Sequence, residues 1–186
     1  MKPILALCAT VWLVAVPTMA SAQTAADRFF SQLQTLCGKS FTGQVVTGDA
    51  VDEPFRKAEL VMTLAQCDAT EIRIPFRVGE DRSRTWVITR VGEGRLRLKH
   101  DHRHADGVED ELSRYGGDAV DAGSVSLQSF PVDAESRALF TRLDRAVSNT
   151  NVWSLGLTQD LFTYQLARPG RLFRVSFDLT RPLPAP

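Results

Sequence analysis

Hydrophobic and polar residues alternate with a period of two from Phe41 onward, the pattern of β-strands that bury one face. The segment Glu71–Val78 shows it most clearly, because Ile, Phe or Val occupies every second position. Pro75 cannot donate a hydrogen bond to a neighbouring strand, so this strand is expected at an edge or beside a bulge. The predicted strands are Phe41–Thr47, Lys57–Gln66, Glu71–Val78, Thr85–Val91, Arg95–His104, Glu109–Tyr115, Ser124–Phe130, Val152–Thr158, Phe162–Arg168 and Arg171–Leu179.

Two short segments have helical spacing instead. Thr24–Cys37 places several large apolar residues on one side and is followed by Gly38, a residue that commonly ends helices. We expect this helix to cover one mouth or edge of the sheet. The second predicted helix, Ala134–Leu143, begins after the capping residue Asp133.

About ten short strands, mostly joined as hairpins, favour an antiparallel up-and-down β-barrel, in which closure hides the sheet edges. The predicted fold is therefore all-β with two short helices, and a β-sandwich or jelly roll is the alternative. The chain lacks the crossover helices that parallel strands need between them, which excludes a parallel α/β fold.

The chain has 186 residues, which suits one domain. Lys2, the apolar run Ile4–Val16 and the small residues Ala20 and Ala22 are typical of a secretory signal peptide. We therefore expect a signal peptide at 1–22 and export to the periplasm or to the outside of the cell.

The remainder is predicted to form a single domain at 23–180 and a flexible tail at 181–186, with no transmembrane segment. The 22 basic and 22 acidic residues balance, and no basic stripe is present, so nucleic acid is not an expected partner. The sequence leaves the oligomeric state open.

Cys8 lies inside the predicted signal peptide, so the mature chain would keep only Cys37 and Cys67. In an oxidising compartment we expect these two to form a structural disulfide, with a redox-active pair as the alternative. On the chain-entropy model, closing a loop of about 30 residues stabilises a fold by roughly 3–4 kcal/mol.

The three histidines of the chain, His100, His102 and His104, occupy alternate positions of one predicted strand. They should therefore share a face, which begins with apolar residues, and an acidic segment containing Glu109 and Glu111 follows the turn.

Two turns fit Asp106-Gly107. A two-residue turn sets His104 opposite Glu109 and His102 opposite Glu111. A three-residue turn shifts every pair by one and sets Asp101 opposite Glu111, a like-charge pair. We therefore expect the two-residue turn.

In that register three imidazoles and two carboxylates lie on one face, and such a set suits zinc, copper, nickel or non-haem iron. The residues that could hold a divalent transition metal, zinc or iron, are His100, His102, His104 and Glu109 or Glu111. A solvated polar rim is the alternative.

Three resemblances add to this interpretation. The short helix, the glycine-flanked first strand Gly38–Gly43 and the serial hairpins resemble the calycins, the superfamily of lipocalins and fatty-acid-binding proteins. His102-Arg103-His104, Glu109 and Gly116 have spacings that resemble the first cupin motif, but no later histidine supplies the second motif. The block Leu98–Gly107 with Tyr115-Gly116-Gly117 resembles exported bacterial β-barrel proteins, a likeness that implies no activity.

The calycin likeness implies a non-enzymatic protein that binds a small, largely apolar ligand in a barrel. Trp86, Trp153 and Tyr164 are the candidate wall residues. Arg90 could anchor an anionic ligand, but an ordinary salt bridge at the strand end is the favoured explanation for it. The alternatives are a metal-binding protein or metalloenzyme that uses the histidines, and a structural protein of the cell envelope.

Overall fold

The computed structural model describes residues 22–92 and 94–184, and the elements below are those of this part of the chain. All but the last residue of the predicted signal peptide therefore lies outside the described residues. The strands are β1 (Ser40–Thr47), β2 (Leu60–Thr63), β3 (Gln66–Cys67), β4 (Glu71–Val78), β5 (Asp81–Val91), β6 (Arg95–His102), β7 (Tyr115–Asp118), β8 (Leu127–Pro131), β9 (Val152–Leu157), β10 (Leu161–Arg168) and β11 (Arg171–Asp178). The helices are α1 (Ala25–Gln34), α2 (Glu53–Lys57) and α3 (Ala134–Arg142), with short 3₁₀ segments at Ala50–Asp52 and Ala146–Thr150.

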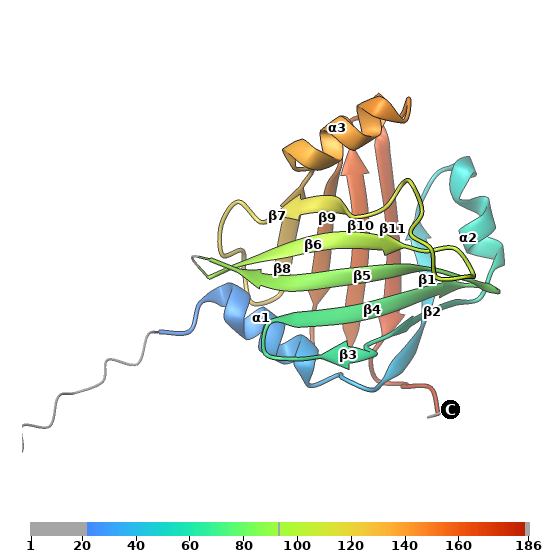
Figure 1. Ribbon diagram of the computed structural model, residues 1–186. Helices are drawn as coiled ribbons and strands as arrows, with labels where there is room; N and C mark the ends of the chain where they lie inside the picture. Colours follow the sequence, from blue (N-terminus) through green and yellow to red (C-terminus); the bar gives the residue numbers. More distant parts are fainter. Residues whose placement is uncertain (1–21, 93, 185–186) are drawn as a thin grey trace, which may run out of the picture.

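The strands form one antiparallel sheet in the order β7-β6-β5-β4-β2-β1-β11-β10-β9-β8, with β3 paired to β4 beside this path. Strands β4 to β6 cross the direction of β9 to β11 at a steep angle, and the sheet curls into a nearly closed barrel (Figure 1). The predicted up-and-down barrel is confirmed. Helix α2 was not predicted, because five residues are too few to show a helical period, and the predicted strand Lys57–Gln66 starts at its last residue.

The barrel closes where β7 meets the end of β8. The Asp133 backbone N–H donates to the Gly116 carbonyl at 2.9 Å. A Cβ atom on Gly116 would lie 1.9 Å from the Leu98 carbonyl oxygen, and one on Gly117 would lie 1.9 Å from that of Pro131. Only glycine fits so close to both neighbours. The predicted strand Glu109–Tyr115, ended by these glycines, is therefore wrong, since the glycines lie inside β7.

Pro75 lies in β4 at an interruption of the neighbouring strands. The β2–β4 pairing ends at Met62 opposite Phe76, and the β3–β4 pairing resumes at Gln66 opposite Arg73. The extra residue between these pairs is a bulge, and Pro75 occupies the stretch in which no ladder partner needs its missing N–H. Of the two expected settings for this proline, the bulge is the one observed.

Helix α1 covers one end of the barrel. The Thr24 hydroxyl accepts a hydrogen bond from the Asp27 backbone N–H at 3.1 Å, and the Asp27 carboxylate accepts one from the Thr24 backbone N–H at 3.0 Å. This capping box starts the helix. Its buried residues are Ala26, Phe29, Phe30 and Leu33.

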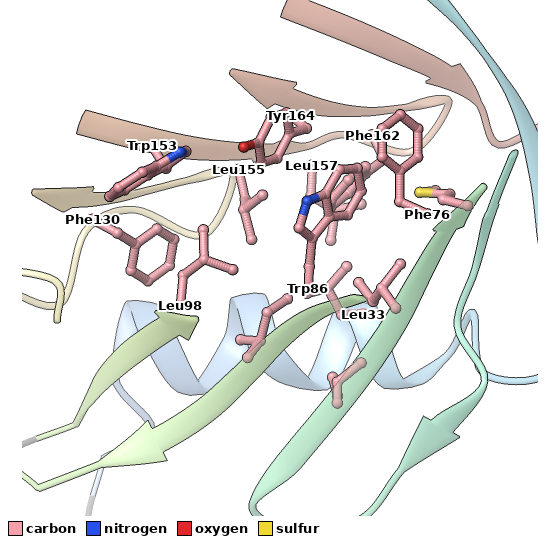
Figure 2. Packing of buried hydrophobic residues seen from close by; sticks show 14 of the residues in the cluster. Leu33, Phe76, Trp86, Leu98, Phe130, Trp153, Leu155, Leu157, Phe162 and Tyr164 are labelled. Atoms are coloured by element: carbon pink, nitrogen blue, oxygen red, sulfur yellow. The ribbon is translucent and has the colours of Figure 1, made fainter. Parts of the chain in front are cut away.

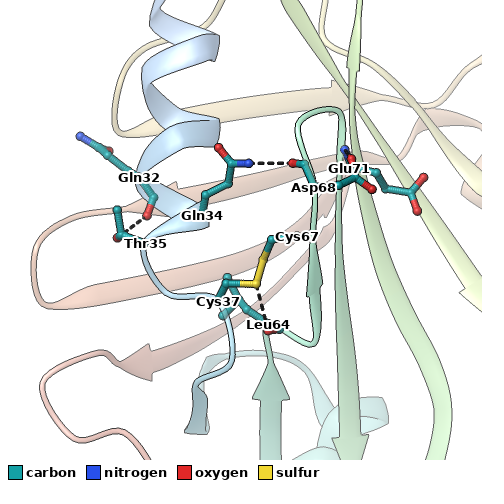
Figure 3. The surroundings of a disulfide bond; sticks show 8 residues. All are labelled: Gln32, Gln34, Thr35, Cys37, Leu64, Cys67, Asp68 and Glu71. Carbon is teal, nitrogen blue, oxygen red and sulfur yellow. Dashed lines mark hydrogen bonds between the residues drawn. A yellow bond between two sulfur atoms is a disulfide. The ribbon is translucent and has the colours of Figure 1, made fainter.

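A disulfide joins the segment after α1 to the sheet, as predicted. Cys37 and Cys67 are bonded, with their Cα atoms 6.2 Å apart (Figure 3). Close by, the Gln34 side-chain amide donates to the Asp68 carbonyl at 2.7 Å. The helix is therefore fastened to strand β3 and to the turn that follows it.

Large side chains fill the barrel interior (Figure 2). The largest of the fully buried ones are Trp153, Phe29, Phe30, Phe41, Phe130, Phe162 and Phe177. Trp153, one of the predicted ligand-wall residues, is 1% exposed and belongs to this core. The space left for a ligand is therefore at the ends of the barrel rather than in its middle.

The chain after β11 stays against the barrel as far as it is described, because the Leu183 backbone N–H donates to the Ser40 carbonyl at 2.8 Å. None of the helices in the described part of the chain is both long enough and apolar enough to cross a membrane. The disulfide is compatible with the expected export.

Candidate functional site

Two of the three histidines face the inside of the barrel at the end of β6. His100 continues the buried face of Leu96 and Leu98 and is 2% exposed. His102 is half-buried and is the last residue of the strand. His104 lies beyond it with a side chain that is 58% exposed, and its Nε2 is 3.7 Å from an Asp110 carboxylate oxygen. The predicted common face is therefore observed for His100 and His102.

The hairpin that follows has the three-residue turn, so the expected two-residue turn is wrong. The His104 backbone N–H donates to the Val108 carbonyl, and the Asp110 N–H donates to the His102 carbonyl, both at 2.9 Å. Arg103 is accordingly paired with Glu109.

The repulsion that argued against this turn does not arise. After Asp110 the chain leaves the ladder, and it rejoins at Tyr115 opposite His100. Glu111 is exposed within this excursion and does not face Asp101. Instead, the Asp101 carboxylate binds Arg73 at 2.5 Å and Arg103 at 3.1 Å.

The predicted metal ligands are not assembled in the described residues. Glu109 forms an ion pair with Arg114 at 2.6 Å, Glu111 is exposed, and His104 lies beyond the strand that carries the other two histidines. Residues 22–92 and 94–184 contain no group of three His, Cys, Asp or Glu side chains placed to hold a metal ion. Metal binding stays a prediction from the sequence alone.

His100 has both ring nitrogens occupied by hydrogen bonds. Its Nδ1 lies 3.2 Å from the Tyr115 carbonyl oxygen, which can only accept, so Nδ1 carries the proton. Burial lowers the pKa of His100 to about 3, and the ring is neutral at ordinary pH. Nε2 is therefore an acceptor, and the Tyr164 hydroxyl donates to it at 2.9 Å.

His102 forms a second pair with a tyrosine. Its Nε2 lies 3.2 Å from the Tyr115 hydroxyl, and the Tyr115 ring stacks on His100 with a centroid distance of 4.6 Å. Burial, followed by the charge of Arg84, lowers the pKa of His102 below its ordinary value. Burial also raises the pKa values of Tyr115 and Tyr164, so both hydroxyls stay protonated at neutral pH.

These pairs line a hollow of about 200 Å³ at the end of the barrel away from α1. We call it the mouth hollow. Its lining comes from seven helices and strands and from the 3₁₀ segment before α2, and it is mostly aromatic. The residues are Asp52, Phe55, Phe76, Arg84, Trp86, His100, His102, Tyr115, Tyr164, Leu166, Arg171 and Phe173.

A row of stacked rings forms one wall of the mouth hollow. The centroid distances along the row are 6.5 Å between Phe55 and Phe76, 4.7 Å between Phe76 and Trp86, and 4.4 Å between Trp86 and Tyr164. The planes of these neighbours are inclined by no more than 19°. The row starts in α2 and ends in β10, so it joins the helix to the opposite half of the barrel.

Two arginines line the same space. Arg171 binds both carboxylate oxygens of Asp52, at 2.5 and 2.6 Å, and the Asp52 side chain is 4% exposed. Arg84 forms an ion pair with Asp81, and its guanidinium lies 5.7 Å from the centroid of the Phe55 ring.

Two of the four predicted ligand-contact residues, Trp86 and Tyr164, therefore lie in the mouth hollow. Arg90 lies at the opposite end of β5, ion-paired with Asp27 and 4.2 Å from the centroid of the Phe30 ring. This is the salt bridge at a strand end that the sequence offered as the alternative for Arg90.

Arg84, the two pocket phenylalanines from α2 and β11, and the Asp52–Arg171 pair were not predicted. Alternation along β5 could have indicated Arg84, since it shares a face with Trp86. The other residues come from segments far apart in the chain, and nothing in their spacing shows that they meet. Comparison with known protein families, with curated proteins and with solved structures finds no match to this chain.

Proposed function

We propose that the protein is a non-enzymatic binder of a small, largely apolar molecule, which it holds in the mouth hollow. The observation that carries the proposal is the lining itself. A row of aromatic rings supplies apolar contact, and a few polar groups at one side can orient a ligand. Concave, mostly apolar sites with a small number of placed polar groups are typical of small-molecule binding.

The size of the hollow limits the ligand. An apolar cavity of about 150 Å³ in another protein accepts a benzene molecule. The mouth hollow, at about 200 Å³, has room for one ring with a small substituent. A lipid-sized ligand has no room below it, since Trp86 and Phe162 fill the barrel there, 2% and 0% exposed.

The calycin likeness of the sequence supports the same proposal. An up-and-down barrel with a short helix near its start is the architecture in which that superfamily holds apolar ligands. Here the ligand would sit at the mouth, because the side chains of the core occupy the interior. As an exported protein it would bind such a molecule in the periplasm or outside the cell.

Filling the hollow tests the proposal. Leu166 lines it and is half-buried, so Leu166→Trp should fill the space without removing a buried side chain. Leu161→Trp, at a 45% exposed position of the same strand, is the matched control. Ligand-detected NMR with a set of single-ring compounds measures binding.

We expect some of these compounds to bind the wild type and Leu161→Trp, and none of those to bind Leu166→Trp. Thermal melts confirm that both variants fold. Absence of binding to the wild type, or unchanged binding to a folded Leu166→Trp protein, would refute the proposal.

A further inference from the structure

Among the charged side chains that line the mouth hollow in the described part of the chain, one positive charge has no partner within the lining. Among the described residues that line it, the carboxylate of Asp52 is neutralised by Arg171 through two hydrogen bonds. His100 is neutral, since burial lowers its pKa to about 3. Arg84 is thus the one ionised lining residue of the described chain that no other lining residue neutralises.

The counter-ion of Arg84 leaves most of its donors free. Asp81 lies outside the lining, is 43% exposed at its side chain and contacts only Nη1 of the guanidinium. Within the described residues, Nε and Nη2 of Arg84 make no hydrogen bond, and the side chain is 28% exposed. Arginine carries five N–H donors, so a second acceptor can be bound beside Asp81.

The charge of Arg84 reaches the inside of the hollow. Burial is the largest influence on the pKa values of His102, Tyr115 and Tyr164, and the charge of Arg84 lowers all three. Asp110, Asp81 and Asp101 oppose this effect at His102, but none of the three lines the hollow. A negative group placed between Arg84 and the tyrosines would therefore meet a positive potential.

Resting on the proposed function, we infer that the ligand is a small aromatic carboxylate whose carboxylate is bound by Arg84. The planar guanidinium can bind the two oxygens of a carboxylate side by side, and the row Phe55–Phe76–Trp86–Tyr164 provides apolar contact for the ring. A hollow of about 200 Å³ accepts a benzoate-sized molecule. Arg84 thus binds the charged group of the ligand, and the aromatic row contacts its ring.

The test compares three probes of nearly the same shape: benzoate, neutral benzamide and the benzylammonium cation. Their dissociation constants are measured on the disulfide-bonded protein by calorimetry and by tryptophan fluorescence, since Trp86 lies in the wall. We expect benzoate to bind at least tenfold more tightly than benzamide, and benzylammonium to bind more weakly than either.

The variants assign this preference to one side chain. Arg84→Gln should abolish the preference for benzoate, so that the dissociation constants of benzoate and benzamide come within about twofold of each other. Arg84→Lys should keep part of the preference, because it keeps the charge but loses the fork. Arg82→Gln is the matched control, since it removes the same charge from an exposed position on the same strand.

The outcomes separate this inference from the proposed function. If benzamide binds as well as benzoate, or if folded Arg84→Gln still prefers benzoate, the assignment of the carboxylate to Arg84 is overturned while the mouth hollow remains a binding site. If no single-ring compound binds the wild type, both proposals fail together.

Discussion

The two ends of the barrel have similar residues but different structures. Arg84 and Arg90 lie on the same face of β5, one near each mouth, and the guanidinium of each lies over a phenylalanine of a covering helix. At the α1 end the phenylalanine is Phe30, which is completely buried. At the α2 end it is Phe55, which is half-buried and borders the mouth hollow.

The difference follows from how each helix is held. Helix α1 has ten residues, a capping box, four buried side chains and a disulfide just beyond its end. Helix α2 has five residues, none of them buried and no side-chain cap. A helix that buries a full apolar face closes its end of the barrel, whereas a short one leaves a hollow in which an arginine can meet a ligand. The role of each arginine is therefore set by the helix that covers its end of the barrel and not by the residue type.

The largest expected effect comes from truncating the two phenylalanines. Phe30→Ala should lower the free energy of unfolding by roughly 3–5 kcal/mol, as large-to-small changes at buried aromatic positions do. Phe55→Ala should cost only about 1 kcal/mol, since its side chain is only partly buried. Urea unfolding of both variants measures the difference. Equal losses would show that α2 closes its end as firmly as α1.

His100, at the mouth-hollow end of the barrel, makes the free energy of unfolding depend on pH. Its folded pKa of about 3 lies below the ordinary value, so acid protonates the unfolded chain first. The stability that the neutral ring contributes is complete above about pH 6.5 and falls as the pH falls towards 3. Between pH 7 and pH 5 this amounts to about 2 kcal/mol.

The comparison with His100→Gln isolates that contribution, because glutamine does not titrate and still offers a donor and an acceptor. Urea unfolding at both pH values should show a loss about 2 kcal/mol larger for the wild type than for the variant. His102 and the carboxylates of lowered pKa are common to both proteins. Identical losses would contradict the placement of a neutral His100 between Tyr115 and Tyr164.

The smallest expected effect compares the arginines themselves. Arg90→Gln removes the ion pair with Asp27 and the contact with Phe30, and should lower the free energy of unfolding by about 1 kcal/mol. Arg84→Gln removes an ion pair with a more exposed partner and should change it by less than about 0.5 kcal/mol. A larger loss for Arg84→Gln would mean that Arg84 serves stability rather than ligand binding.

The strand positions were largely predictable. Strand β4 has the predicted bounds, and the strands from β9 onward differ by one residue at an end. These segments have a clean alternation because one side faces a continuous core. The prediction failed between Glu109 and Asp118, where polar residues and glycines carry no alternation, and at α2, where a five-residue helix is too short for a helical period.

The site residues that were predicted are those that face inward by alternation along their own strand. His100 and His102 face inward because alternation along β6 requires it, and Trp86 follows from the same rule on β5. The predicted hairpin register is wrong because the like-charge pair of Asp101 and Glu111, which argued against the three-residue turn, does not form. The structure removes it by an excursion of the chain after Asp110 and by pairing Asp101 with Arg73 of β4.

The sequence by itself determined most of the strands, the barrel class, the disulfide and the inward direction of two histidines, because each depends on short-range periodicity or on a single pair of residues. Only the tertiary structure decided that the hydroxyls of Tyr164 and Tyr115 form hydrogen bonds with the Nε2 atoms of those histidines. It also decided that Arg84 rather than Arg90 borders the mouth hollow. The physical reason is that barrel closure brings α2, β4, β10 and β11 to one end. Contacts between such distant segments depend on how the sheet coils, and the spacing of residues within one segment does not show this coiling.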